Sequence, residues 1–161
     1  MSDSTAEPRP LTFSSVKTYG PAAGFSCAFR QWRAESHCRF LHGYSLAVSV
    51  EFQASELDER GWVVDFGALK SFKAWLEDLF DHKTLIAEDD PLLPQFRELH
   101  AAGALDLVVV PAVGCERFAQ MVLERAEAWL REHGLAPRCW VALAEVREHD
   151  GNAGRARPVS R

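Results

Sequence analysis

The chain lacks the signals that mark membrane and secreted proteins. None of its apolar runs approaches the ~18 residues that a membrane-spanning helix needs, although 47% of its residues are hydrophobic. Residues 1–10 are polar and acidic, without the charged-then-apolar order of a secretory signal peptide. We therefore expect a cytoplasmic protein that does not bind membranes.

Paired cysteines and basic blocks are also missing. The cysteines are scattered without any paired spacing, in a chain long enough to bury its own core, so we expect reduced thiols. They are Cys27, Cys38, Cys115 and Cys139. The net charge of −5, with no cluster of lysines and arginines, argues against nucleic acid as a partner. A small molecule or another protein is the expected partner.

Length and composition indicate one globular domain. The chain has 161 residues, of which 25% are charged, and this length is about that of one domain. We expect the domain over residues 11–148. Residues 1–10 and 149–161 are rich in serine, proline, glycine and arginine, so we expect them to be mobile ends.

The pattern of apolar residues predicts the secondary structure. Strands are indicated at residues 11–19, 25–32, 41–52, 62–64 and 139–147. Helical spacing predicts one helix from an Asp65 cap to about Phe80, and a second over 118–130 that closes at Gly134. Residues 91–102 are weakly helical, and 105–110 form either a strand or a buried connection. This order favours an α+β fold with an antiparallel sheet and helices on one side.

Two polar side chains head an apolar row in the strand at 41–52. His42 and Tyr44 alternate in phase with Leu46 and Val48, so they point to the same face as the apolar residues. They are either satisfied polar groups of the core or the floor of a pocket.

Two further segments hold groups suited to proton transfer. Cys38 stands in a polar loop between His37 and Arg39, where positive charge favours the thiolate, so it is a candidate base or nucleophile or else an ordinary loop cysteine. Asp81 and His82 follow the first helix. Adjacent side chains do not easily pair, so each is expected to reach a different partner across a pocket, or merely to end the helix.

Two acids stand out in the second half of the chain. Glu145 shares a strand face with Val141 and Leu143, so its carboxylate either binds hydrogen-bond donors of a ligand or lies at an exposed strand end. Glu116 falls in the first turn of the second helix, where the helix dipole favours an acid.

Taken in order, six short segments resemble the family of 6-pyruvoyl-tetrahydropterin and 6-carboxytetrahydropterin synthases. The resemblance covers residues 13–146. The segments are Phe25-Ser26-Cys27-Ala28, Cys38 through Gly43, Gly61 through Phe66, Asp81-His82, Cys115-Glu116 and Ala144-Glu145.

The resemblance implies a tunnelling fold (T-fold), with a four-stranded antiparallel sheet, two main helices on one face, and assembly into homo-trimers or hexamers with sites at subunit borders. It implies a lyase that converts 7,8-dihydroneopterin triphosphate to 6-carboxy-5,6,7,8-tetrahydropterin, with release of acetaldehyde and triphosphate, on the route to 7-deazaguanine nucleosides such as queuosine. The alternatives are 6-pyruvoyl-tetrahydropterin synthase activity, a metal-free pterin-binding protein without catalysis, and a structural assembly protein.

The resemblance also assigns roles to single residues. Cys38 matches the catalytic thiol, with Asp81 and His82 as its partner dyad. Glu145 matches the carboxylate that anchors the pterin ring. The other substrate-binding candidates are Glu116, Tyr44 and, for the triphosphate, Arg30, Arg33, Arg39 and Lys83.

The zinc site is where the chain departs from the family pattern. The three zinc histidines of the family fall on Phe29, His42 and Tyr44, so only His42 is retained as a metal ligand. A single imidazole cannot hold zinc, which needs three or four protein ligands. Either the metal is lost or the site has moved onto Cys27 and His37. Tyr44 would bind a metal only as phenolate, or would instead donate a hydrogen bond to the substrate hydroxyl.

Overall fold

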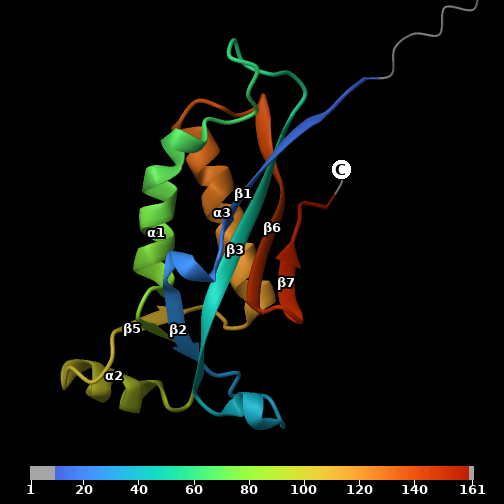
Figure 1. Cartoon of the computed structure of the whole chain (residues 1–161). Coiled ribbons are helices and arrows are strands. Elements are labelled where there is room, and N and C mark those ends of the chain that lie inside the picture. The colour runs from blue at the N-terminus through green and yellow to red at the C-terminus, as the bar shows by residue number, and fades with distance from the viewer. Residues whose placement is uncertain (1–9, 160–161) are drawn as a thin grey trace, which may run out of the picture.

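The computed structural model describes residues 10–159, which form a seven-stranded sheet with helices on one face (Figure 1). The strands are β1 (Phe13–Tyr19), β2 (Phe25–Phe29), β3 (His42–Ala54), β4 (Lys83–Ala87), β5 (Leu107–Val110), β6 (Cys139–His149) and β7 (Asn152–Ala156). Their order is β5-β4-β2-β3-β6-β7. β1 and β2 share one edge of the long β3, because β1 pairs with its second half and β2 with its first.

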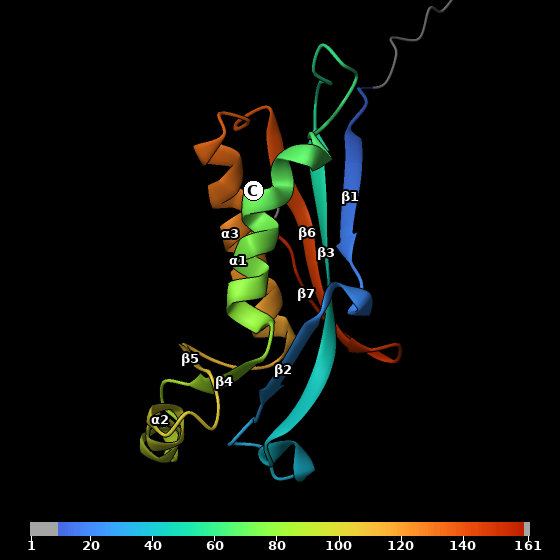
Figure 2. The ribbon, with the colours of Figure 1, turned by 60° about the vertical axis from the view of Figure 1, so that its left-hand side comes forward.

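The helices are α1 (Lys70–Phe80), α2 (Leu93–Ala101) and α3 (Cys115–Glu132). Figure 2 shows α1 and α3 packed against the same face of β1, β3 and β6, with α2 beside β4 and β5. An indole hydrogen bond from Trp129 Nε1 to Ser71 Oγ, 3.1 Å long, links α3 to α1. None of the helices in residues 10–159 is long and apolar enough to cross a membrane.

The elements with the clearest periodicity lie where the sequence predicts them. In β3, Leu46, Val48, Val50 and Phe52 are all fully buried under the helices, as the alternation indicates. The Asp65 side chain accepts a hydrogen bond from the Gly67 N–H, 2.7 Å, in the 3-10 turn that leads into α1. The predicted antiparallel α+β arrangement is therefore confirmed for the centre of the sheet.

The edge of the sheet differs from the prediction. The sheet has more than four strands, because β4 pairs parallel with β2 and β5 pairs parallel with β4, and α2 is a further helix. The predicted strand at 62–64 is instead a loop. The Arg138 guanidinium donates hydrogen bonds to the carbonyl oxygens of Val63, at 2.9 Å, and of Glu56, at 2.8 Å. These bonds satisfy backbone carbonyls that a neighbouring strand would otherwise bind.

The predicted mobile C-terminal end contains a strand. β7 pairs antiparallel with β6 through the turn at Asp150-Gly151, a dipeptide typical of hairpins. β7 also packs on the start of α3, because a Cβ atom on Gly154 would lie only 2.2 Å from the Glu116 backbone nitrogen. The prediction of a mobile N-terminal end falls almost entirely on residues 1–9, outside the described residues.

A β-bulge shifts the alternation within β6. Glu51 and Phe52 are consecutive in β3, but they pair with Leu143 and Val141, so Ala142 is an extra residue. Before the bulge the buried residues are odd-numbered, and after it they are even-numbered, as at Ala144 and Val146. The bulge therefore turns Glu145 away from the helices and Glu148 toward them.

The tight contact at Gly154 makes a prediction about stability. Gly154→Ala places a methyl group against the backbone of α3, so we expect an overpacking cost of about 1–3 kcal/mol and a melting temperature lower by roughly 3–10 °C. Gly20→Ala is the control, because a Cβ atom there meets nothing within 4 Å. Equal melting temperatures for the two variants, measured by circular dichroism, would contradict the packing described.

Candidate active site

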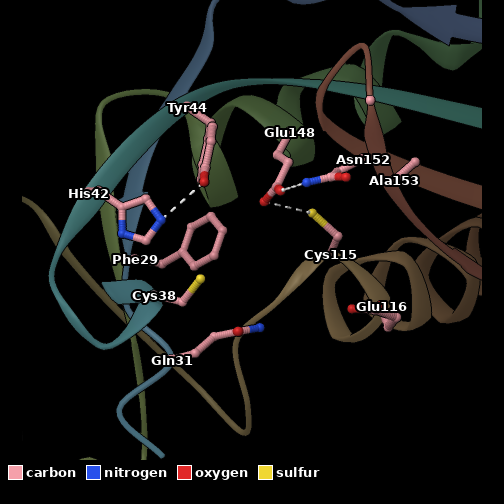
Figure 3. Close-up of a pocket in the computed structure, with 11 residues that line it drawn as sticks. Phe29, Gln31, Cys38, His42, Tyr44, Cys115, Glu116, Glu148, Asn152 and Ala153 are labelled. Atoms are coloured by element: carbon pink, nitrogen blue, oxygen red, sulfur yellow. Dashed lines mark hydrogen bonds between the residues drawn. The ribbon is translucent and has the colours of Figure 1, made fainter. Parts of the chain in front are cut away.

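A cavity of about 350 Å³ opens where β2 and β3 meet the start of α3 and the β6–β7 hairpin (Figure 3). Its lining combines two thiols, two carboxylates and an aromatic cluster. The lining residues are Phe29, Gln31, Cys38, His42, Tyr44, Cys115, Glu116, Glu148, Gly151, Asn152 and Ala153. The structure thus brings together four of the residues that the sequence singled out: Cys38, His42, Tyr44 and Glu116.

Cys38 enters the cavity from a 3-10 turn at His37–Arg39. The Ser36 hydroxyl caps this turn by accepting a hydrogen bond from the Cys38 N–H, 3.4 Å. The Cys38 carbonyl accepts a second one from the Gln31 N–H, 3.0 Å, which ties the turn to the end of β2. The half-buried thiol is therefore held at the cavity wall by backbone bonds on both sides.

His42, Tyr44 and Phe29 form a packed aromatic cluster. His42 Nδ1 lies 2.6 Å from the Phe40 carbonyl, which only accepts, so Nδ1 carries the proton. In the neutral ring Nε2 is then an acceptor, and it receives the Tyr44 hydroxyl at 3.1 Å. The buried ring of Phe29 packs on both, with centroids 6.0 Å from His42 and 5.8 Å from Tyr44.

These residues do not fit a zinc ion. Phe29 has no donor atom, and the Tyr44 hydroxyl occupies the ring nitrogen that His42 would offer. Burial, followed by the charge of Glu148, raises the pKa of Tyr44, so its oxygen stays a neutral hydroxyl. Within residues 10–159, no group of three or more histidine, cysteine, aspartate or glutamate side chains is placed to hold a metal. The predicted ligand His42 therefore has none of the companions that zinc requires.

The alternative metal site at Cys27 and His37 is not formed either. Cys27 is 5% exposed, and burial, followed by the nearby Cys115, raises the pKa of its thiol to about 12. Cys27 also does not line the cavity. The His37 side chain is exposed in the turn and does not line the cavity.

Glu148 is the carboxylate of β6 that reaches the cavity. Its Oε1 accepts a hydrogen bond from Asn152 Nδ2, 2.9 Å, and its Oε2 from the Cys115 thiol, 3.8 Å. Burial, followed by the charges of Glu148 and Glu116, raises the pKa of Cys115 to about 12, so this thiol stays a donor. Both oxygens of Glu148 are thus oriented by donors from two other elements.

Glu145, the predicted pterin anchor, lies on the opposite face of β6. Its carboxylate binds Arg147 Nη2 at 2.9 Å and Arg155 Nε at 2.6 Å. Burial opposes its ionisation, but the hydrogen bonds from Arg155 and Arg147 prevail and hold the pKa of Glu145 below its usual range. The prediction placed it on the wrong face, because simple alternation does not reveal the bulge. The Asp150-Gly151 dipeptide is a signal in the sequence for a turn after β6, and it places Glu148 close to the end of that strand.

Asp81 and His82 are paired with each other and do not line the cavity. His82 Nδ1 lies 2.7 Å from Asp81 Oδ1, contrary to the expectation that adjacent side chains do not pair. The His82 backbone is left-handed, with φ of 56°. The His82 side chain is 87% exposed. The Asp81–His82 pair therefore lies at the surface and does not share a cavity with the Cys38 of its own chain.

Most of the candidate triphosphate ligands are already ion-paired. Arg30 Nε lies 2.9 Å from the buried carboxylate of Asp90, and Arg33 Nη2 lies 2.7 Å from Asp89. Lys83 pairs with Asp106. Arg39, beside Cys38, packs instead over the Phe40 ring at 5.9 Å from its centroid. None of the four candidates lines the cavity.

Comparisons with known proteins agree with this architecture. An uncharacterized protein of Wolinella succinogenes superposes with a TM-score of 0.75 at 24% identity, over 91% of this chain and 98% of that one. The 6-pyruvoyltetrahydropterin synthase of Plasmodium vivax gives a TM-score of 0.67 at 16% identity, over 91% and 97%. At these identities the likeness establishes the fold alone, and it confirms the α+β tunnelling fold.

Sequence relatives point to the same family. The 6-carboxy-5,6,7,8-tetrahydropterin synthase of Rickettsia conorii is 32% identical over 72 residues, 44% of this chain and 52% of the relative. The synthase of that name from Aquifex aeolicus is 28% identical over 122 residues, 73% of this chain and 72% of the relative. The chain thus spans about half the length of the rickettsial relative. A family model described as 6-pyruvoyl tetrahydropterin synthase matches residues 21–157, and the chain therefore belongs to that family.

Proposed function

We propose that the protein is a pterin lyase of the 6-carboxytetrahydropterin synthase type. It would convert 7,8-dihydroneopterin triphosphate to 6-carboxy-5,6,7,8-tetrahydropterin and release acetaldehyde and triphosphate. The observation that carries the proposal is one cavity that holds the Cys38 thiol together with the carboxylates of Glu116 and Glu148. A cytoplasmic location and a place on the route to 7-deazaguanine nucleosides such as queuosine are parts of the same proposal.

Glu148 is suited to anchor the pterin ring. The ring presents an amino group and a neighbouring N–H side by side, and a carboxylate accepts two such donors at once. Asn152 and Cys115 fix the orientation of the Glu148 carboxylate before the ligand arrives. Glu116, at the start of α3, supplies a second acceptor at the cavity wall. The carboxylates therefore select a ring rich in N–H donors.

Cys38 is suited to move protons on the side chain of the bound pterin. Figure 3 shows the Cys38 sulfur and the Glu148 carboxylate on different sides of the cavity, so a ring anchored at Glu148 would extend its side chain toward the thiol. A thiol in contact with the reacting carbon atoms can act as general base and then as general acid.

The Asp81–His82 dyad would come from a second subunit. It is paired and exposed, and it does not reach the cavity of its own chain. A homo-oligomer, trimer or hexamer, in which the dyad of one subunit faces the Cys38 of another, would complete the catalytic set. Residues 11–157, with β7 included, would be the single folded unit of this assembly.

A second candidate function is pterin binding without catalysis. It is favoured by Phe29 and Tyr44, which stand at the family's metal positions and offer no imidazole there. The two functions differ in a single readout, because a binding protein retains the pterin affinity conferred by Glu148 but releases no acetaldehyde.

The two acids of β6 give opposite predictions for ligand affinity. Glu148→Gln removes a charged acceptor, so we expect 7,8-dihydroneopterin to bind roughly ten- to a hundredfold more weakly in a fluorescence titration. Glu145→Gln is the matched control, and its affinity should equal that of the wild type. A loss of binding in Glu145→Gln with none in Glu148→Gln would show that the anchor is wrongly assigned.

Cys38→Ala separates binding from chemistry. We expect acetaldehyde release from 7,8-dihydroneopterin triphosphate to fall by at least about a hundredfold, because the proton-transfer group is lost. The affinity for 7,8-dihydroneopterin should change little, since the anchor at Glu148 is intact. Full turnover by Cys38→Ala, followed by mass spectrometry, would rule out this role of the thiol.

Mixing two inactive variants tests the shared site. Cys38→Ala and His82→Ala chains are each expected to be inactive, but co-expressed mixed oligomers should regain part of the wild-type activity. Each mixed oligomer would contain borders where an intact thiol meets an intact dyad. Mixed oligomers that remain inactive, although native mass spectrometry shows that they form, would indicate that the dyad does not act across a border.

A further inference from the structure

We infer that this chain binds the side chain of its pterin ligand without a metal ion, and that Tyr44 Oη, oriented by His42, accepts the hydrogen bond from the ligand's side-chain hydroxyl. The identity of the ligand rests on the proposed function. The inference about the metal does not, because it follows from the donor atoms at the cavity wall.

The hydrogen bonds of the cluster run in one direction. The His42 Nδ1–H donates to the Phe40 carbonyl at 2.6 Å, and the Tyr44 O–H donates to His42 Nε2 at 3.1 Å. The Tyr44 proton is thus committed to the imidazole. The lone pairs of the Tyr44 oxygen remain free toward the cavity, where they accept a hydrogen bond from a ligand hydroxyl. A metal ion would need His42 Nε2, which the Tyr44 hydroxyl occupies, so this hydrogen bond and a metal at His42 are alternatives.

The Phe29 ring packs against the His42–Tyr44 pair and holds it in place. The ring is 3% exposed and packs edge-on against Phe118, with centroids 5.1 Å apart and planes at 88°. The same ring contacts His42 and Tyr44. A metal ion bound at His42 Nε2 would have to break the bond to Tyr44 and lie against this apolar ring. Phe29 therefore supplies packing where a zinc site needs a ligand.

The first arm of the test uses the metal alone. Wild-type protein is dialysed against EDTA and titrated with Zn²⁺ by calorimetry, with metal content measured by mass spectrometry. We expect no stoichiometric binding. The double variant Phe29→His/Tyr44→His restores three imidazoles, and we expect it to bind about one zinc ion per chain. Stoichiometric zinc in the wild type that disappears in His42→Ala would overturn the inference.

The second arm compares two ligands in the presence of EDTA. Tyr44→Phe keeps the ring but removes the acceptor. We expect it to bind 7,8-dihydroneopterin about three- to tenfold more weakly, and 7,8-dihydropterin, which has no side-chain hydroxyls, as well as the wild type does. An equal loss for both ligands, or no loss for either, would overturn the contact at Tyr44. Wild-type protein that binds neither ligand would overturn the proposed function and this contact together, while the zinc arm would still decide the metal question.

Discussion

The β-bulge at Ala142 is the constraint on which the site depends. One extra residue in β6 reverses which side chains face the helices, so Ala144, Val146 and Glu148 follow one another on the inner face. On this face Glu148 accepts hydrogen bonds from Cys115 and Asn152, and a second irregularity, between Arg147 and His149, leaves it without a partner residue in β7. The bulge leaves Glu145 outside, where Arg147 and Arg155 neutralise it. A local irregularity of the backbone thus places the Glu148 carboxylate, and not that of Glu145, at the cavity.

Burial gives the groups around the cavity their chemical character. Cys115 and Cys27 remain protonated because desolvation raises the pKa of each thiol to about 12, so both behave as neutral groups. Cys38 lies instead in a half-exposed turn, which separates the candidate reactive thiol from the structural ones. Partial burial also strengthens the hydrogen bonds that orient Glu148 and Tyr44. The packing of α3 on the sheet therefore sets both the shape and the polarity of the site.

The sequence predicts the parts of the structure that depend on periodicity. Continuous 3.6- and 2-residue patterns locate α1, α3 and β3. The order of short motifs singles out Cys38 and Glu116, and both line the cavity. Alternation cannot reveal an inserted residue, so it predicts the wrong strand face for Glu145. The parallel pairing of β4 with β2 depends on tertiary contacts, and the strand at 152–156 was hidden in a segment rich in glycine and arginine. Spacing also does not show the left-handed backbone at His82 or the pairing of its side chain with Asp81.

The most direct test of the account is product analysis by mass spectrometry, after EDTA-treated protein has been incubated with 7,8-dihydroneopterin triphosphate. The account predicts 6-carboxy-5,6,7,8-tetrahydropterin and acetaldehyde while the chelator is present, because the cavity relies on its own thiol, carboxylates and tyrosine. Conversion that begins only when zinc is added in excess of the chelator would contradict the metal-free site. No conversion under either condition would contradict the lyase assignment.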